Sequence, residues 1–93
     1  MRQSEARHLS RVAELGCALC RRLGYGETPA QIHHLRMDGS VGLQQRERHW
    51  TAIPLCERHH QQPHGIHGDR QDFRNAKCNE LDLLADVLEA IYG

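Results

Sequence analysis

With 93 residues, the chain is long enough for one small domain, and its 39% hydrophobic and 4% aromatic residues predict a thin core. Twelve basic and twelve acidic residues balance, which excludes the strongly basic composition of a dedicated nucleic-acid-binding domain. The sequence holds no apolar run of about 18 residues and no signal peptide, so we expect a cytoplasmic protein without a membrane partner.

The charges are unevenly distributed along the chain. All twelve basic residues lie within 1–77, where they outnumber the acidic residues by four, and residues 79–93 carry a net charge of −4. Eleven of the twelve basic residues are arginine, whose planar guanidinium matches phosphate oxygens. This pattern gives weak support for a nucleic-acid partner, and an ordinary mixed-charge surface remains the alternative.

The N-terminal part of the chain predicts a helix followed by irregular structure. Apolar residues at near-helical spacing indicate a helix over residues 4–15, and Gly16 is suited to end it. We expect a turn over residues 17–20 as the chain leaves this helix. Two glycines within 21–28 then predict a loop.

The middle of the chain predicts two short extended segments. Residues 29–35 and 50–55 are short and apolar enough to form strands, and the glycines within 36–48 predict an exposed loop between them. A helix can begin near His59, but Pro63 limits its length.

The C-terminal segment carries the strongest helical pattern. Its leucines, valine and isoleucine form a broad apolar face with acidic residues opposite, which predicts a helix over 79–92. We expect this helix to be the main packing element of a single domain, 1–93, whose motif-bearing core covers about 15–68.

Two short pairs of metal-binding residue types predict a structural zinc site. Cys17 and Cys20 form one pair, Cys56 and His59 form the other, and in each pair two residues intervene. Zinc binds thiolate and imidazole tetrahedrally, and two such pairs are its usual supply of ligands. Two disulfides are one alternative, although a chain without an export signal argues against them. A buried, purely apolar Cys56 beside a surface His59 is another.

Further histidines remain after the zinc quartet is complete. His33 and His34 are adjacent on an extended segment, so their side chains point to opposite faces. Together with His60 and either His64 or His67, one of the pair can bind a divalent ion while its neighbour acts as a base. The alternative is that all these histidines are structural or simply exposed.

The order of these motifs resembles the HNH (His-Me finger, ββα-metal) endonucleases, especially small phage and prophage members of the Ref type, which are RecA-dependent DNA nucleases. The resemblance covers about residues 15–68 and extends less specifically through Phe73 to Asp86. It is carried by Cys17-x2-Cys20, His33-His34, Ile53-Pro54-Leu55-Cys56, Cys56-x2-His59-His60 and His67-Gly68. It implies an α+β fold: a small zinc-stapled ββα-metal domain with flanking N- and C-terminal helices.

The resemblance also implies roles for the surplus histidines. His33 and His60 match metal ligands, and His34 matches the general base. His67 matches the third ligand, and His64 is the alternative, since Pro63 disturbs the helix that would pair His64 with His60. The implied catalytic ion is Mg²⁺ or Mn²⁺, and Zn²⁺ or Ni²⁺ can replace it in a crystal.

The chain departs from the family at the residue that names the motif. Thr51 stands at the position of the HNH asparagine, which orients the motif's backbone and helps to hold the base. The resemblance therefore leaves catalytic competence open at this position. Arginines that flank the motif are candidates for phosphate contacts: Arg36, Arg46, Arg48, Arg58 and Arg70.

Two functional hypotheses follow. The first is a metal-dependent DNA endonuclease or nickase of phage or prophage recombination, acting in a bacterial or phage-infected cell with a recombinase filament as its implied partner. The second is a non-catalytic zinc-binding module that binds nucleic acid or a protein. The surplus histidines favour the enzyme, because a binding module does not need them.

Overall fold

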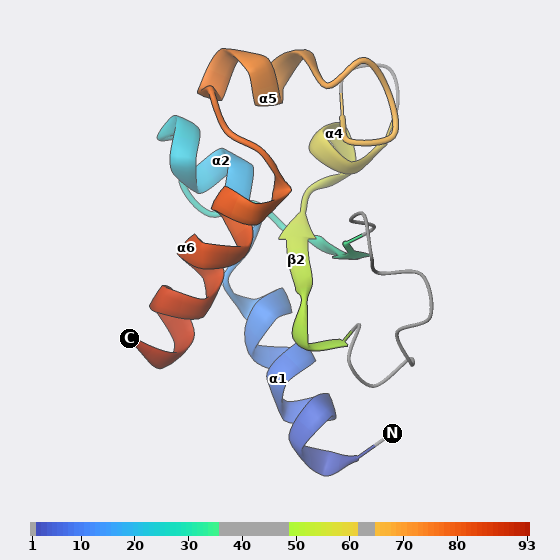
Figure 1. Cartoon of the computed structure of the whole chain (residues 1–93), viewed down its shortest axis with the longest axis vertical. Helices are drawn as coiled ribbons and strands as arrows, with labels where there is room; N and C mark the ends of the chain where they lie inside the picture. Colours follow the sequence, from blue (N-terminus) through green and yellow to red (C-terminus); the bar gives the residue numbers. More distant parts are fainter. Residues whose placement is uncertain (1, 36–48, 62–64) are drawn as a thin grey trace.

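The computed structural model describes residues 2–35, 49–61 and 65–93 (Figure 1). The predicted loop over 36–48 and four candidate site residues lie outside this part of the chain: Arg36, Arg46, Arg48 and His64. The elements follow in the order α1 (Gln3–Glu14), α2 (Ala18–Leu23), β1 (Gln31–His34), β2 (Ala52–Leu55), α4 (Glu57–His60), α5 (Gln71–Ala76) and α6 (Glu80–Tyr92).

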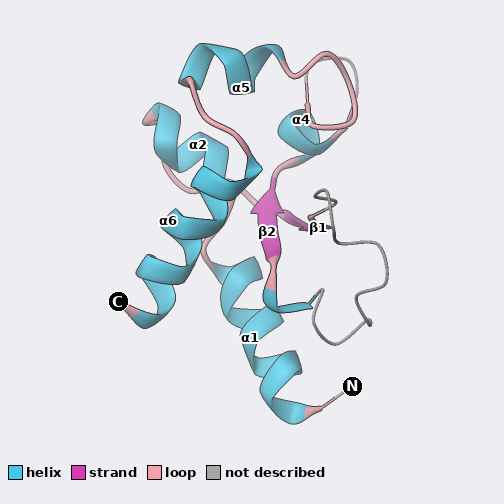
Figure 2. Ribbon diagram, in the orientation of Figure 1, coloured by secondary structure: helices cyan, strands magenta, loops and turns pink. Residues whose placement is uncertain are grey.

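Within the described residues, β1 and β2 form a two-stranded antiparallel sheet (Figure 2). His33 pairs with Ile53 and His34 with Ala52, so the two adjacent histidines enter opposite faces of the sheet. All four residues of β2 are buried, whereas β1 is only partly buried. β1 is therefore the more exposed of the two strands, although its His33 is buried.

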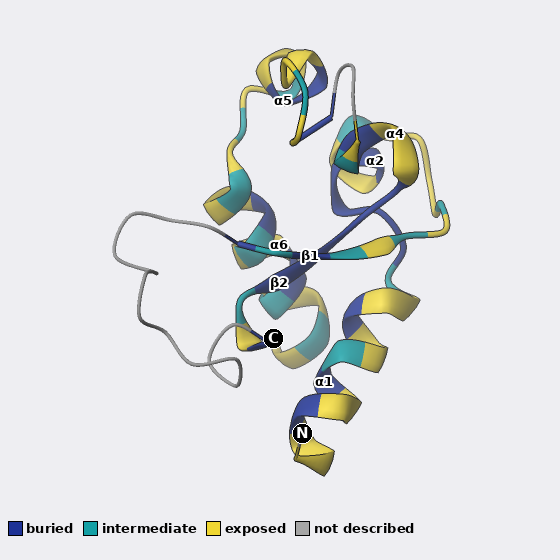
Figure 3. Ribbon diagram, turned by 90° about the vertical axis from the view of Figure 1, so that its right-hand side faces the viewer, coloured by how far each residue is buried: buried dark blue, intermediate teal, exposed yellow. Residues whose placement is uncertain are grey.

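The hydrophobic core forms where α1, α2 and α6 pack around β2 (Figure 3). Val12 of α1, Leu19 of α2 and Leu83 of α6 are fully buried there, together with Ile53 and Leu55. Burying each such side chain contributes roughly 1.5–3 kcal/mol relative to an exposed position. This core is small, in agreement with the composition.

Local sequence signals explain where the principal helices begin and end. Asn79 caps α6 through its side chain, which accepts a hydrogen bond from the Asp82 amide, and the Asp82 carboxylate accepts one from the Asn79 amide in return. Gly16 follows α1 with φ +75°, a conformation that favours glycine. The predicted helices at both ends of the domain are thus confirmed, with small differences in their limits.

Two expectations about the local structure were wrong. Residues 17–20 do not form a simple turn, and residues 21–23 are not loop, because α2 begins directly after Cys17 and ends at Gly24 in the left-handed conformation. Helix α5 was not predicted at all. It lies between Arg70 and Lys77, whose φ values of 59° and 55° replace the glycines that usually mark such ends.

The described part of the chain has the α+β architecture expected from its sequence: a two-stranded sheet covered by helices. Among its helices, none has the length and apolar character needed to cross a membrane.

Candidate metal centres and active site

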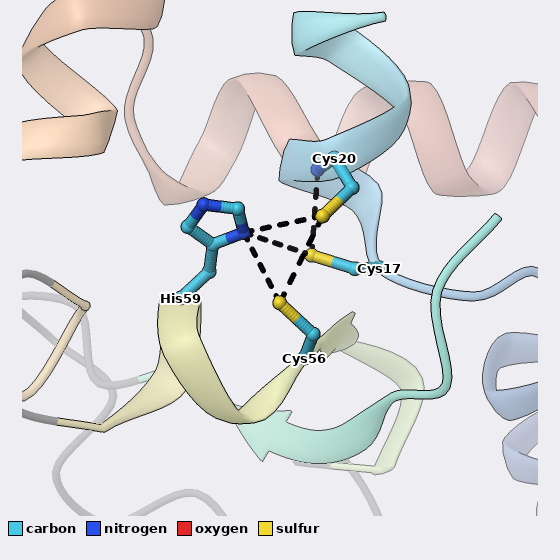
Figure 4. Close-up of side chains that lie close together, drawn as sticks. All are labelled: Cys17, Cys20, Cys56 and His59. Carbon is cyan, nitrogen blue, oxygen red and sulfur yellow. Dashed lines mark hydrogen bonds between the residues drawn. The ribbon is translucent and has the colours of Figure 1, made fainter. Parts of the chain in front are cut away.

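The four predicted zinc ligands converge on one buried point (Figure 4). Nδ1 of His59 lies 3.4 Å from Sγ of Cys17, 3.4 Å from Sγ of Cys20 and 3.2 Å from Sγ of Cys56. The sulfurs of Cys20 and Cys56 are 3.8 Å apart. All four side chains are buried; Cys17 and Cys20 come from the start of α2, and Cys56 and His59 come from the start of α4.

Two helix starts position these donors. Cys17 precedes the first residue of α2, so Cys20 lies one turn later on the same side, and its amide donates to the Cys17 sulfur at 3.4 Å. Cys56 precedes α4 in the same way and brings His59 onto its own side. The short spacing of each pair thus arises from one turn of helix.

The donor set fits zinc. With Zn–S bonds of about 2.3 Å, two thiolates of a tetrahedral site lie about 3.8 Å apart, and an imidazole nitrogen lies slightly closer to each sulfur. Burial raises the pKa of the Cys17 thiol to about 12 and also raises the pKa of Cys20, so a nearby cation would favour the thiolate form of both. The described cysteines are all free of disulfides, and the cluster can hold a structural metal.

Asp72 of α5 contacts the outer side of this cluster. Its Oδ2 lies 3.0 Å from Nε2 of His59, in an ion-pair geometry that is not aligned as a hydrogen bond, and 3.2 Å from Nε of Arg58. Burial is the main cause of the lowered pKa of His59, and the carboxylate acts in the opposite direction. Asp72 therefore contacts the nitrogen of His59 that faces away from the cysteines, a contact that sequence reasoning missed.

A second cluster forms from His33, His60 and His67. The ligand atoms of these three histidines all lie within 4.8 Å of one another, and Nε2 of His60 is 3.1 Å from Nε2 of His67. His33 is buried, His60 is half-buried and His67 is exposed, so the cluster opens toward solvent on one side. Three imidazoles around an open side can hold an ion while leaving positions for water and substrate.

The backbone between α4 and α5 brings His67 to this cluster. The Ile66 amide donates to the His59 carbonyl at 2.8 Å, and the His67 amide donates to the His60 carbonyl at 3.1 Å. Gly65 permits this return, because a Cβ on it would lie 2.3 Å from the Gln61 carbonyl oxygen. Of the two candidate third ligands, His67 lies beside His60, and His64 is outside the described residues.

Gln31 selects the nitrogen that His60 presents to the cluster. Its Oε1 lies 2.7 Å from Nδ1 of His60, closer than the Gln61 amide nitrogen at 3.3 Å, and this shorter contact favours a proton on Nδ1 and a lone pair on Nε2. Burial lowers the pKa of His60, and the neighbouring His33 and His67 lower it further. All three effects favour the neutral imidazole, which is the form that binds a metal.

His34 lies apart from the three clustered histidines and contacts His49 instead. Nε2 of His34 is 3.2 Å from Nδ1 of His49, and the ring centroids are 5.2 Å apart. His49 is buried and precedes Trp50 at the approach to β2. Sequence reasoning missed His49, although a histidine just before the strand paired with His34 was a usable signal.

Three other predicted site residues lie within the described part of the chain: Thr51, Arg58 and Arg70. Thr51 directly precedes β2. Arg58 is exposed despite its bond to Asp72, and exposed Arg70 donates from Nε to the Ile66 carbonyl at 3.1 Å. Both guanidinium groups are anchored near the histidines and remain accessible from solvent.

The fold and its two clusters define a small α+β protein with one closed Cys₃His donor set and one open His₃ set. The model of a family described as recombination enhancement, RecA-dependent nuclease matches residues 3–91. The chain belongs to this family, which confirms the resemblance to Ref-type nucleases. Membership indicates a nuclease that acts on nucleic acid in recombination and depends on RecA. No curated protein and no solved structure matches the chain.

Proposed function

We propose that this chain is a metal-dependent DNA endonuclease or nickase of the HNH type, acting in phage or prophage recombination inside a bacterial cell. The observation that carries the proposal is the presence of a complete His₃ cluster in addition to the Cys₃His quartet. The strand–strand–helix order of β1, β2 and α4 supports a ββα-metal site, because His33 comes from the first strand and His60 from the helix.

In the proposed mechanism, His33, His60 and His67 hold a divalent ion, Mg²⁺ or Mn²⁺. Such an ion supplies charge neutralisation at the scissile phosphate and at the departing 3′ oxygen. The zinc quartet has no such role, since four protein ligands leave no open position. It holds α2, α4 and the end of β2 together, so that the histidines of β1 and α4 face one another.

His34 acts as the general base in this proposal. A ring nitrogen of His34 accepts a proton from the attacking water, while His49, whose Nδ1 lies 3.2 Å from Nε2 of His34, holds the ring in place. In HNH nucleases an asparagine helps to hold the base, and Thr51 stands at its position in this chain. This assignment gives the orienting role to His49 instead. The buried His49 side chain fixes the ring of His34 and stabilises the positive charge that develops on it.

Arg58 and Arg70 contact phosphates of the DNA on either side of the cleaved bond. Anchoring of each Nε by Asp72 or by the Ile66 carbonyl leaves the terminal guanidinium nitrogens free to bind phosphate oxygens. Because these contacts are electrostatic, DNA binding weakens as salt increases.

The test is cleavage of plasmid DNA and of RecA-filament-paired DNA by the zinc-loaded protein, with Mg²⁺ or Mn²⁺ added. We expect His60→Ala to reduce cleavage by at least about 100-fold while zinc content stays unchanged. Gln71→Ala, an exposed substitution on α5, is the control. Cleavage that survives His60→Ala, or one bound metal and no cleavage under either ion, contradicts the proposal; the second result identifies a non-catalytic zinc module.

A further inference from the structure

Glu80, the first residue of α6, reaches across the fold to a histidine of the open cluster. Its Oε1 lies 2.8 Å from Nε2 of His33, although 47 positions separate the two residues. The side chains are 6% exposed for His33 and 15% exposed for Glu80, so this contact is shielded from solvent. A hydrogen bond to a charged group in such surroundings is stronger than one at the surface.

The chemistry of this contact fixes the tautomer of His33. An ionised carboxylate only accepts hydrogen bonds, so Nε2 of His33 carries the proton that Glu80 accepts. Nδ1 is then the only nitrogen of His33 with a lone pair for a metal. Among the described residues, the group whose ligand atoms lie within 4.8 Å of one another contains His33, His60 and His67 but not Glu80. Glu80 is therefore assigned as a partner of His33 and not as a fourth ligand of the metal.

His60 shows the same arrangement with a different partner. Gln31 binds Nδ1 of His60 at 2.7 Å, which leaves Nε2 for the cluster. Two of the three histidines thus have one ring nitrogen held by an oxygen acceptor from another residue. Partners of this kind fix ring orientation and raise ligand basicity, and their loss typically reduces metal affinity about 10–100-fold.

We propose that Glu80 is a positioning residue for the metal site formed by His33, His60 and His67. The proposal rests on the proposed function, because it assigns Glu80 to the same site. It links α6, the principal packing helix, to the catalytic cluster: docking of α6 on the core delivers the carboxylate that sets the donor nitrogen of His33.

The first experiment needs no added metal at the open site. Long-range ¹H–¹⁵N NMR of the imidazoles in the zinc-loaded protein, at about pH 8, distinguishes the two tautomers of His33. We expect the Nε2-protonated form in the wild type and a mixture in Glu80→Ala. A wild-type His33 protonated at Nδ1 overturns the proposal, as does a tautomer that does not respond to Glu80→Ala.

The second experiment is Mn²⁺ titration of the zinc-loaded protein. We expect Glu80→Ala to weaken Mn²⁺ binding about 10–100-fold and Glu80→Gln, whose amide oxygen still accepts the hydrogen bond, to weaken it less. Glu89→Ala, an exposed position near the other end of α6, is the matched control and leaves affinity unchanged. Zinc content and urea midpoint confirm that each variant is folded.

A double-mutant cycle separates positioning from direct ligation. If Glu80 acts through His33, Glu80→Ala has no further effect in a His33→Ala background; a loss that adds to that of His33→Ala overturns the positioning role. Failure of the wild type to bind Mn²⁺ at all contradicts the proposed function, whereas equal affinity of wild type and Glu80→Ala contradicts only this inference. In the first case the NMR experiment still decides the role of Glu80.

Discussion

Nε2 of His60 lies 3.1 Å from Nε2 of His67. Oε1 of Gln31 lies 2.7 Å from Nδ1 of His60, which favours a proton on Nδ1 and a lone pair on the Nε2 that faces His67. Two imidazole nitrogens at this distance share either a proton or a cation. A shared proton would join only two nitrogens, whereas the ligand atom of His33 also lies within 4.8 Å of the other two. This third histidine favours a cation at the centre of the cluster.

This relationship predicts which histidine is the third ligand. His67→Ala should weaken Mn²⁺ binding at the open site at least about 10-fold and reduce DNA cleavage in parallel, since the ion loses one of three protein ligands. His64→Ala should leave both unchanged. Mn²⁺ titration of the two variants measures this directly, and the reverse order of effects would transfer the ligand role to His64.

The contact between His34 and His49 predicts different kinetic effects for the two residues. Loss of a general base costs typically about 10²–10⁴-fold in rate, so His34→Ala should reduce kcat by this factor without weakening Mn²⁺ binding. His49→Ala should reduce kcat less, because the base remains but loses its orienting partner.

The pH profile of the His49→Ala enzyme supplies the control for that comparison. If His49 stabilises protonated His34, the acidic limb of the profile shifts to lower pH in the variant, because the base becomes harder to protonate. Equal kcat and an unshifted profile would exclude His49 from the site.

The convergence of Cys17, Cys20, Cys56 and His59 was predictable because the information that forms each pair is local. Each pair of donors is separated by two residues, and one helical turn after Cys17 or Cys56 is sufficient to place both on one side. Only the meeting of the two pairs depends on the fold. The limits of α1 and α6 were predictable for a similar reason, since caps and apolar periodicity lie within the helix sequence.

The partners of the histidines were not predictable from local pattern. Glu80 reaches His33 only because α6 packs beside the sheet, and Asp72 reaches His59 only because α5 packs on α2. A carboxylate on a helix surface carries no sequence signal of its partner. Helix α5 was missed because Arg70 and Lys77 adopt positive φ at its ends without the glycines that mark such positions.

The closed cluster predicts one zinc per chain and a strong dependence of folding on it. Cys56→Ser should abolish stoichiometric zinc and leave the chain largely unfolded, because the free energy of binding structural zinc, on the order of 10 kcal/mol, is comparable to the whole stability of a small domain. Cys78→Ser is the matched control, since Cys78 is outside the cluster. Elemental analysis and circular dichroism check both variants, and a folded, zinc-free Cys56→Ser protein would contradict the structural role.

The close approach at Gly65 predicts a substitution that separates the two sites. A Cβ at this position meets the Gln61 carbonyl oxygen at 2.3 Å and the His59 carbonyl carbon at 2.6 Å, so the return of the chain to His60 must open. Gly65→Ala should therefore displace His67 and weaken Mn²⁺ binding at least about 10-fold, as expected for a lost ligand. Gly26→Ala strains the backbone at φ +86° without a steric clash, so it is the control for general destabilisation. Unchanged Mn²⁺ affinity in Gly65→Ala would show that the His67 contact does not depend on this turn.

His8 predicts a pH dependence of stability that does not involve either metal cluster. It is 1% exposed, and its Nδ1 lies 2.6 Å from the Tyr92 hydroxyl. Burial lowers the pKa of His8 from its ordinary value of 6.5, and Arg11 lowers it further. Between the lowered pKa of native His8 and pH 6.5, this residue binds more protons in the unfolded chain than in the native chain. The contribution of His8 to stability is therefore present above pH 6.5 and is lost as pH falls through the native pKa.

Urea unfolding of the zinc-loaded protein between pH 7.5 and about 5.5 should show a smaller loss of stability for His8→Gln than for the wild type. Equal losses in the two proteins would mean that His8 titrates alike in the folded and unfolded chains.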